Sequence, residues 1–197
     1  MPEAGKTPGR LRTVLVVALT AALAAGAVYI LRGGERSAAG APGDSGAVTQ
    51  VEAAGGQNGP APEVGEPAPN FAETDVEGRQ VALEDLRGRP VWLVFGATWC
   101  ANCRAEMTDV AAVAQQLAGE AQVVAFYFGE SAEAVADYAE RLGLDFPQIA
   151  DPLTEIGAKY RVMGVPTHVF LDADGVVTAI DVGPLTQAQA LKRLGLD

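Results

Sequence analysis

The two cysteines of this 197-residue chain, Cys100 and Cys103, lie where an apolar run gives way to a helical pattern. The run Val91–Phe95 is continuously apolar, which is typical of a central strand buried on both faces. From Cys103 to Leu117, apolar residues recur at helical spacing. The sequence therefore predicts a fold in which a buried strand leads directly into a helix, with both cysteines at the junction.

This junction favours thiolate chemistry. The first turn of a helix leaves backbone N–H groups without partners, and these groups and the helix dipole stabilise an anion. A cysteine placed there has a lowered pKa, and the thiolate is the form that attacks a disulfide. A spacing of two residues brings the sulfurs within bridging distance. We expect Cys100 to be the exposed nucleophile and Cys103 the more buried resolving thiol.

Other uses of a C-x-x-C pair fit the sequence less well. Arg104 stands where haem attachment through C-x-x-C-H needs a histidine. His168 is the only histidine, and together with two cysteines it does not complete a four-ligand zinc site. We expect no metal and no cofactor, and we place His168 on a strand, facing away from the sulfurs, in a structural role. Two incidental buried thiols are the alternative to a redox-active pair.

The rest of the chain after the first third predicts an α/β domain. Helices between apolar strands indicate right-handed crossovers over a central mixed sheet, which a final hairpin extends. An extra N-terminal β-hairpin is expected around the turn Glu77-Gly78. The other predicted elements are a strand at Val123–Phe128, helices at Ala132–Leu142 and Leu153–Tyr160, a hairpin of His168–Leu171 and Val176–Val182, and a helix from the N-cap Thr186 to Leu194.

The N-terminal segment has the composition of a membrane anchor. Residues 1–13 are polar and basic, and the uncharged run Val14–Leu31 would extend about 27 Å as a helix, close to the hydrocarbon thickness. The basic flank predicts an orientation with the N-terminus inside and the rest of the chain outside. A cleaved signal peptide ending near Ala25–Ala27 is the alternative. Residues 32–63 are rich in Gly, Ala, Ser and Pro and are predicted to be a flexible linker.

The net charge of −11 arises within residues 64–197, which carry nine basic and twenty acidic side chains. An acidic domain without a basic cluster repels a phosphate backbone, so we expect no binding to nucleic acid.

Five motifs follow one another in the order found in the ResA/TlpA/DsbE-like group, and over residues 64–197 the sequence resembles this group. The motifs are VGEPAPNF, LEDLRGRPVWLVFGATWC, CRAEM, FGES and GVPTHVFLDADG. The resemblance implies a thioredoxin-like fold and a monomeric, membrane-tethered, extracytoplasmic oxidoreductase. It also implies that the protein exchanges disulfides with protein partners, often reducing apocytochrome c, with electrons supplied by a transmembrane thiol relay.

The resemblance also assigns roles to single residues. Pro166 matches the proline that is cis in thioredoxin folds, where the backbone of Val165, beside Thr167, would pair with a substrate strand. Glu106 matches an acidic residue near the active site that could exchange protons with Cys103; a solvated surface glutamate is the alternative. Trp99 would cover one side of the disulfide and shape the contact with the partner.

Three positions depart from the pattern of the group, and one of them, Asn102, leaves the direction of electron flow open because this position influences the reduction potential. Asn102 stands where proline usually precedes the second cysteine, Thr108 replaces a proline after CRAEM, and Gly96 replaces a common tryptophan. The main function expected is a reductant, with a DsbA-type oxidant as the alternative. A thiol peroxidase is disfavoured because Leu93 and Ala97 occupy the Pro and Thr positions of its motif, and a copper-delivery module because the cysteine spacing differs.

Overall fold

The computed structural model describes residues 49–50, 61–117 and 119–196, which belong to a unit that spans Ser45–Asp197. Within these ranges, no helix is long and apolar enough to cross a membrane. Three predicted segments lie wholly or almost wholly outside the described residues: the basic N-terminus 1–13, the apolar run 14–31 and the linker 32–63.

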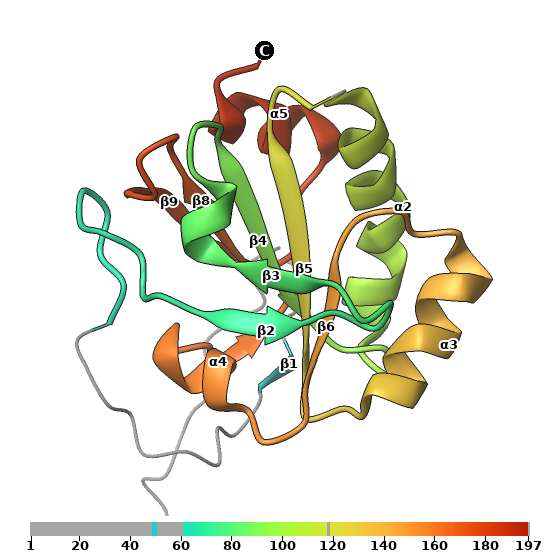
Figure 1. Cartoon of the computed structure of the whole chain (residues 1–197). Coiled ribbons are helices and arrows are strands. Elements are labelled where there is room, and N and C mark those ends of the chain that lie inside the picture. The colour runs from blue at the N-terminus through green and yellow to red at the C-terminus, as the bar shows by residue number, and fades with distance from the viewer. Residues whose placement is uncertain (1–48, 51–60, 118, 197) are drawn as a thin grey trace, which may run out of the picture. The chain divides into compact units, whose positions relative to one another are not determined.

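The centre of the domain is a five-stranded mixed sheet in the order β6-β5-β4-β8-β9 (Figure 1). Strands β4, β5 and β6 are parallel, whereas β8 and β9 run antiparallel to their neighbours. All six residues of β4 are buried, as its continuous apolar sequence predicts. In chain order the strands are β4 (Val91–Gly96), β5 (Gln122–Phe128), β6 (Gln148–Asp151), β8 (Thr167–Leu171) and β9 (Val177–Val182).

Each face of the sheet is covered by its own apolar cluster. On one face, α2, α3 and α5 contribute buried side chains to an apolar cluster that includes Trp92 and Phe170 of the sheet and Met107 of α2. On the other face, the N-terminal hairpin and α4 pack over the sheet through Phe71 and Ile156. The helices are α2 (Ala101–Gln116), α3 (Ala132–Leu142), α4 (Glu155–Lys159) and α5 (Gln187–Leu194).

The extra N-terminal hairpin is present and consists of β2 (Ala72–Thr74) and β3 (Gln80–Ala82), followed by the 3₁₀ helix η1 (Leu83–Leu86). Its turn is organised by the buried carboxylate of Asp75. This carboxylate accepts the backbone N–H of Arg79 at 2.8 Å and the Nε–H of the same residue at 2.7 Å. The hairpin therefore has a fixed shape on the face of the sheet that it covers.

Capping residues account for the ends of two helices. The hydroxyl of Ser131 accepts the N–H of Ala134 at the start of α3, and Gly143 ends that helix in the left-handed conformation with φ 64°. Thr186 and Gln189 form a reciprocal capping box at the start of α5. Both starts, and the end of α3 at Leu142, agree with the sequence prediction.

Two elements differ from the prediction. Strand β6 is not predicted, because its end residue Gln148 is polar; in the structure this residue is buried, and the Tyr127 hydroxyl donates to its Oε1 at 2.6 Å. The predicted helix Leu153–Tyr160 is shorter, and α4 begins only at Glu155. The reason is that the preceding Thr154 has a left-handed backbone with φ 56°, which a continuous helix does not allow.

Candidate active site

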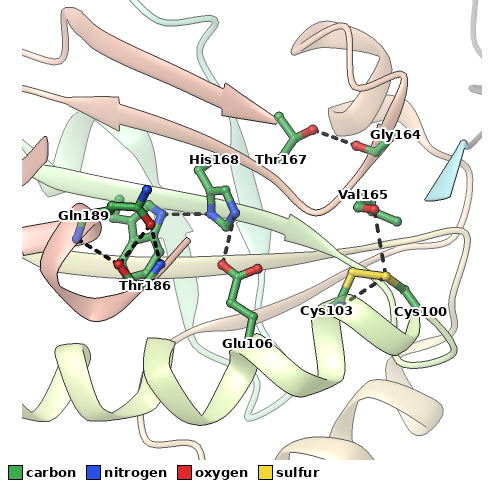
Figure 2. A network of polar contacts seen from close by, with 10 residues as sticks. Cys100, Cys103, Glu106, Gly164, Val165, Thr167, His168, Thr186 and Gln189 are labelled. Atoms are coloured by element: carbon green, nitrogen blue, oxygen red, sulfur yellow. Dashed lines mark hydrogen bonds and ion pairs between the residues drawn. A yellow bond between two sulfur atoms is a disulfide. The ribbon is translucent and has the colours of Figure 1, made fainter. Parts of the chain in front are cut away.

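Cys100 and Cys103 form a disulfide at the N-terminus of α2, directly after β4 (Figure 2). Their Cα atoms are 5.3 Å apart, a normal separation for a bridged pair. Cys100 is the N-cap of the helix, and its Sγ accepts the backbone N–H of Cys103 at 3.2 Å. In the reduced protein, a donor in this position stabilises a thiolate on Cys100. The strand-to-helix junction predicted from the sequence is confirmed as the position of the pair.

Both cysteines are buried, which corrects the prediction that Cys100 is the exposed thiol. Cys100 is 1% exposed and Cys103 is 4% exposed. The Sγ of Cys100 lies 3.9 Å from the carbonyl oxygen of Val165, so the backbone before Pro166 packs against this sulfur. The neighbouring Trp99 is 50% exposed, and it presents an accessible apolar surface next to the disulfide.

The loop against Cys100 contains the cis peptide bond between Val165 and Pro166, as the resemblance implies. The hydroxyl of Thr167 donates a hydrogen bond of 2.6 Å to the carbonyl oxygen of Gly164 (Figure 2). Because Thr167 is buried, its side chain supports the loop from inside and does not present a surface to a partner.

The strand next to this loop, β7 (Gly164–Val165), pairs antiparallel with β1 (Thr49–Gln50), with Val165 opposite Thr49. Residues 49–50 fall within the predicted linker, where the sequence pattern does not predict a strand. The backbone edge beside Cys100 is therefore paired with an N-terminal segment of the same chain.

Glu106 lies one helical turn after Cys103 and is 5% exposed, so it is not the solvated surface glutamate that was the alternative. Its Oε1 lies 3.0 Å from Nε2 of His168 on β8 (Figure 2). The two groups approach without hydrogen-bond alignment, and in the described part of the chain neither carboxylate oxygen has an aligned partner. A buried carboxylate with so few partners is costly, and such groups are found at functional sites.

The contact between His168 and Glu106 is not predicted from the sequence. His168 lies on a strand, as expected, but it points toward α2 and Glu106 (Figure 2). Its Nδ1 accepts a hydrogen bond of 3.2 Å from the indole Nε1–H of Trp92 on β4. The signal in the sequence is a histidine inside the otherwise apolar strand after Pro166, which needs a polar partner when buried.

Glu130 is a second residue near the site whose role is not predicted from the sequence. Its carboxylate accepts the backbone N–H of Thr98 at 2.7 Å and also accepts the hydroxyl of Thr98. Glu130 follows β5 and Thr98 follows β4, and these parallel strands end at the same edge of the sheet. The FGES motif thus holds the loop that leads into Trp99 and Cys100.

The surroundings of the pair leave the redox interpretation in place. Among the described residues, no group of three or more His, Cys, Asp or Glu side chains is arranged to hold a metal ion. Leu93 and Ala97, at the positions of Pro and Thr in the peroxidase motif, are buried and apolar. The hydroxyl that polarises a peroxide in that motif therefore has no counterpart at residue 97.

A disulfide at the N-terminus of a helix, beside a cis-proline loop and on a central mixed sheet with helices on both faces, defines a thiol–disulfide oxidoreductase of the thioredoxin fold. The chain belongs to the AhpC/TSA family, whose pattern matches residues 64–180.

Known proteins of this class are similar to the chain over most of its length. The thioredoxin-like protein YneN of Bacillus subtilis is 36% identical over 136 residues, which cover 68% of this chain and 79% of that protein. The thiol-disulfide oxidoreductase ResA of Bacillus cereus is 34% identical over 128 residues, covering 64% and 74%. A thiol:disulfide interchange protein of Chlorobium tepidum superimposes with a TM-score of 0.62 at 27% identity, covering 69% of this chain and 98% of that one.

Proposed function

We propose that the protein is a reductant of disulfides in extracytoplasmic proteins, as in cytochrome c maturation. The supporting observation is that the buried ionisable group one turn beyond Cys103 is an acid, Glu106. A carboxylate does not stabilise a neighbouring thiolate. A dithiol whose reduced form is little stabilised has a low reduction potential, whereas oxidants of the DsbA type stabilise their reduced form strongly. The acidic neighbour therefore favours a reductant over the DsbA-type alternative.

The proposed reaction begins with the Cys100 thiolate. It attacks one sulfur of a partner disulfide, which forms a mixed disulfide and releases the other partner sulfur as a thiolate. Cys103 then gives its proton to the Glu106 carboxylate and attacks the Sγ of Cys100. This step closes the Cys100–Cys103 bond and releases the second partner sulfur as a thiolate. Two electrons pass to the partner, and Glu106 afterwards releases its proton to solvent.

We assign partner binding to Trp99 and to the loop of Val165, Pro166 and Thr167. Trp99 offers exposed apolar surface, and the backbone of Val165 lies on a strand that pairs with Thr49–Gln50 and that an extended partner segment would pair with in their place. Because Thr167 is buried, its part is to fix the shape of the loop. The expected partner is an extended segment that carries a pair of cysteines, such as an apocytochrome c before haem attachment.

We assign residues 64–197 as the catalytic domain and 32–63 as its linker. Residues 14–31 are the membrane anchor, with 1–13 on the cytoplasmic side and the domain outside. These assignments rest on the uncharged run and its basic flank in the sequence. In this arrangement the protein works as a monomer, and a transmembrane thiol relay returns it to the dithiol form after each reaction.

The reduction potential of the full-length protein, measured at equilibrium against glutathione, tests the direction of electron flow. A value below about −220 mV supports the reductant, and a value near about −120 mV, as in DsbA, overturns it. A Cys103→Ala variant should at the same time retain partners as mixed disulfides on Cys100, with Cys100→Ala as the matched control. If neither partners nor model disulfides are captured by Cys103→Ala, protein disulfides are not the substrate.

A further inference from the structure

Trp92, His168 and Glu106 form a buried line of polar groups that joins three elements next to the disulfide. Trp92 lies on β4, His168 on β8 and Glu106 on α2, and each is at most 5% exposed. The indole N–H donates to Nδ1 of His168 at 3.2 Å, and Nε2 of the same ring lies 3.0 Å from Glu106 Oε1. The mechanism proposed above uses only the last member of this line.

The hydrogen bond from Trp92 determines which nitrogen of His168 carries the proton. An indole N–H is a donor only, so the Nδ1 that receives it must present a lone pair. The ring proton of His168 is then on Nε2, the nitrogen that faces Glu106. An imidazolium in the same position would direct Nδ1–H at the Trp92 N–H, donor against donor. The contact with Trp92 thus holds His168 as a neutral ring.

The position of Trp92 is itself well fixed. Its ring stacks on Phe170 with centroids 5.5 Å apart and an angle of 14° between the planes. On the paired strands, Trp92 lies opposite Phe170, and Val94 lies opposite His168. The donor and the imidazole therefore belong to alternate pairs of the same two strands, Trp92–Phe170 and Val94–His168, inside a close-packed core.

A neutral N–H and a cation act differently on a buried carboxylate. A cationic histidine would hold Glu106 ionised through charge attraction, and the carboxylate would then be a poor acceptor for the Cys103 proton. A neutral N–H supplies no counter-charge, so it does not compete with a proton for the carboxylate. Nε2 of His168 lies 3.0 Å from Glu106 Oε1 without hydrogen-bond alignment, so in the proposed step the two side chains must turn for the N–H to orient the carboxylate. On α2, the buried Cys103 precedes Glu106 by one turn, and on β8 Nε2 of His168 lies 3.0 Å from Glu106 Oε1.

We infer that His168, held as the neutral Nε2–H tautomer by Trp92, is the positioning residue of the oxidoreductase. It orients the Glu106 carboxylate so that it can take the proton of Cys103 when Cys103 attacks Cys100. This inference rests on the proposed function, because it concerns the same proton transfer. It adds two residues to that reaction, His168 on β8 and the hydrogen-bond donor Trp92 on β4.

The tautomer can be observed directly, because His168 is the only histidine of the chain. Long-range ¹⁵N–¹H correlation spectra of the oxidised full-length protein at pH 7 should show a single imidazole with Nδ1 unprotonated and Nε2 protonated. The Trp92→Phe variant keeps an aromatic ring but removes the donor, and it should lose this pure tautomer. A wild-type ring with Nδ1 protonated, or with both nitrogens protonated, would overturn the inference.

The rate of thiol–disulfide exchange tests the role of the tautomer. His168→Leu should slow the step in which Cys103 attacks by about tenfold, part of the 10²–10⁴-fold that a positioned proton acceptor typically supplies. His168→Gln keeps an N–H donor near the position of Nε2 and should recover most of that rate. Thermal unfolding of His168→Leu and His168→Gln shows whether a slower exchange rate comes from a destabilised fold.

The decisive measurement is the double variant. If His168 acts through Glu106, then Glu106→Gln with His168→Leu should be no slower than Glu106→Gln alone, since both changes remove the same interaction. A further tenfold loss in the double variant would assign His168 a structural role and overturn the inference. The capture of partners by Cys103→Ala does not depend on this pair, so its failure would overturn the proposed function separately.

Discussion

Asp151 and Glu106 are two carboxylates with the same exposure, 5%, and different surroundings. Asp151 ends β6, and its two oxygens accept the backbone N–H groups of Ile156 at 3.3 Å and Gly157 at 2.8 Å at the start of α4. Within the described part of the chain, Glu106 has no aligned hydrogen-bond partner, and Nε2 of His168 lies 3.0 Å from its Oε1. Burial alone therefore does not distinguish the two carboxylates; the difference between them is that the hydrogen bonds of Asp151 are complete and those of Glu106 are not.

The energetic reason is the cost of desolvation. A carboxylate that accepts two backbone N–H groups recovers much of the hydration it loses on burial, and it stabilises the fold. A carboxylate whose one polar neighbour is misaligned recovers little of this hydration, so its burial lowers the stability of the fold. Substitution by the isosteric amide tests both statements, because it removes the charge without changing the shape of the side chain.

The largest loss of stability is expected for Asp151→Asn. The amide offers one acceptor oxygen, so one of the two N–H groups, on Ile156 or Gly157, faces an NH₂ group and loses its partner. Leaving a buried N–H unsatisfied costs about 1–3 kcal/mol of the free energy of unfolding. Urea denaturation measures this loss, and the reduction potential should stay at the wild-type value. An unchanged midpoint would mean that the carboxylate is not needed to hold α4.

An intermediate effect is expected for Tyr160, a buried hydroxyl with a complete hydrogen bond. It donates to the carbonyl oxygen of Pro69 at 2.7 Å, and burial raises the pKa of Tyr160. Tyr160→Phe should therefore lower the free energy of unfolding by about 1 kcal/mol at pH 7. In the wild type, the unfolded state loses the phenol proton above pH ~10 while the folded state keeps it, so stability falls as the pH rises.

This alkaline loss amounts to about 1.4 kcal/mol per pH unit for one group. The Phe variant should show a slope that is shallower by about that amount above pH ~10. Below pH ~10 the phenol is protonated in both the folded and the unfolded state, so the two proteins should differ by a constant free energy there. Denaturation at several alkaline pH values measures the slope. Equal slopes in the two proteins would show that Tyr160 ionises as easily in the folded state as in the unfolded one.

The smallest change in stability is expected for Glu106→Gln. The substitution relieves the burial of a charge, but it adds an NH₂ group that also lacks an aligned partner, so the free energy of unfolding should change by less than about 1 kcal/mol. The exchange rate should nevertheless fall, because the amide cannot accept the proton of Cys103. If Glu106→Gln loses as much stability as Asp151→Asn, the contrast between the two carboxylates fails.

The sequence predicts the parts of this structure that depend on local pattern. Strands β4 and β5 follow from unbroken apolar runs, and α3 and α5 follow from their caps at Ser131 and Thr186. The cysteine pair follows from its place between a strand and a helix. Pro166 is identified by its motif, since nothing in local pattern distinguishes a cis proline from a trans one.

The features that the sequence does not predict depend on long-range register. His168 meets Glu106 because β8 pairs with β4 so that Val94 lies opposite His168, which brings the imidazole over α2. No periodicity in the chain encodes the distance between residues so far apart. Strand β6 is missed for a related reason: its polar ends are satisfied by tertiary partners, such as the hydroxyl of Tyr127 for Gln148.

Because β1 pairs with β7, a segment of the chain itself occupies the backbone of Gly164–Val165 next to the disulfide. An outside segment that adds to β7 competes with Thr49–Gln50, and tethered ligands act at effective concentrations on the order of millimolar. A partner that offers only backbone hydrogen bonds would therefore compete poorly with Thr49–Gln50 for β7. In the proposed function, a partner that replaces Thr49–Gln50 on β7 would therefore need contacts beyond its backbone, for instance an apolar side chain against the exposed Trp99.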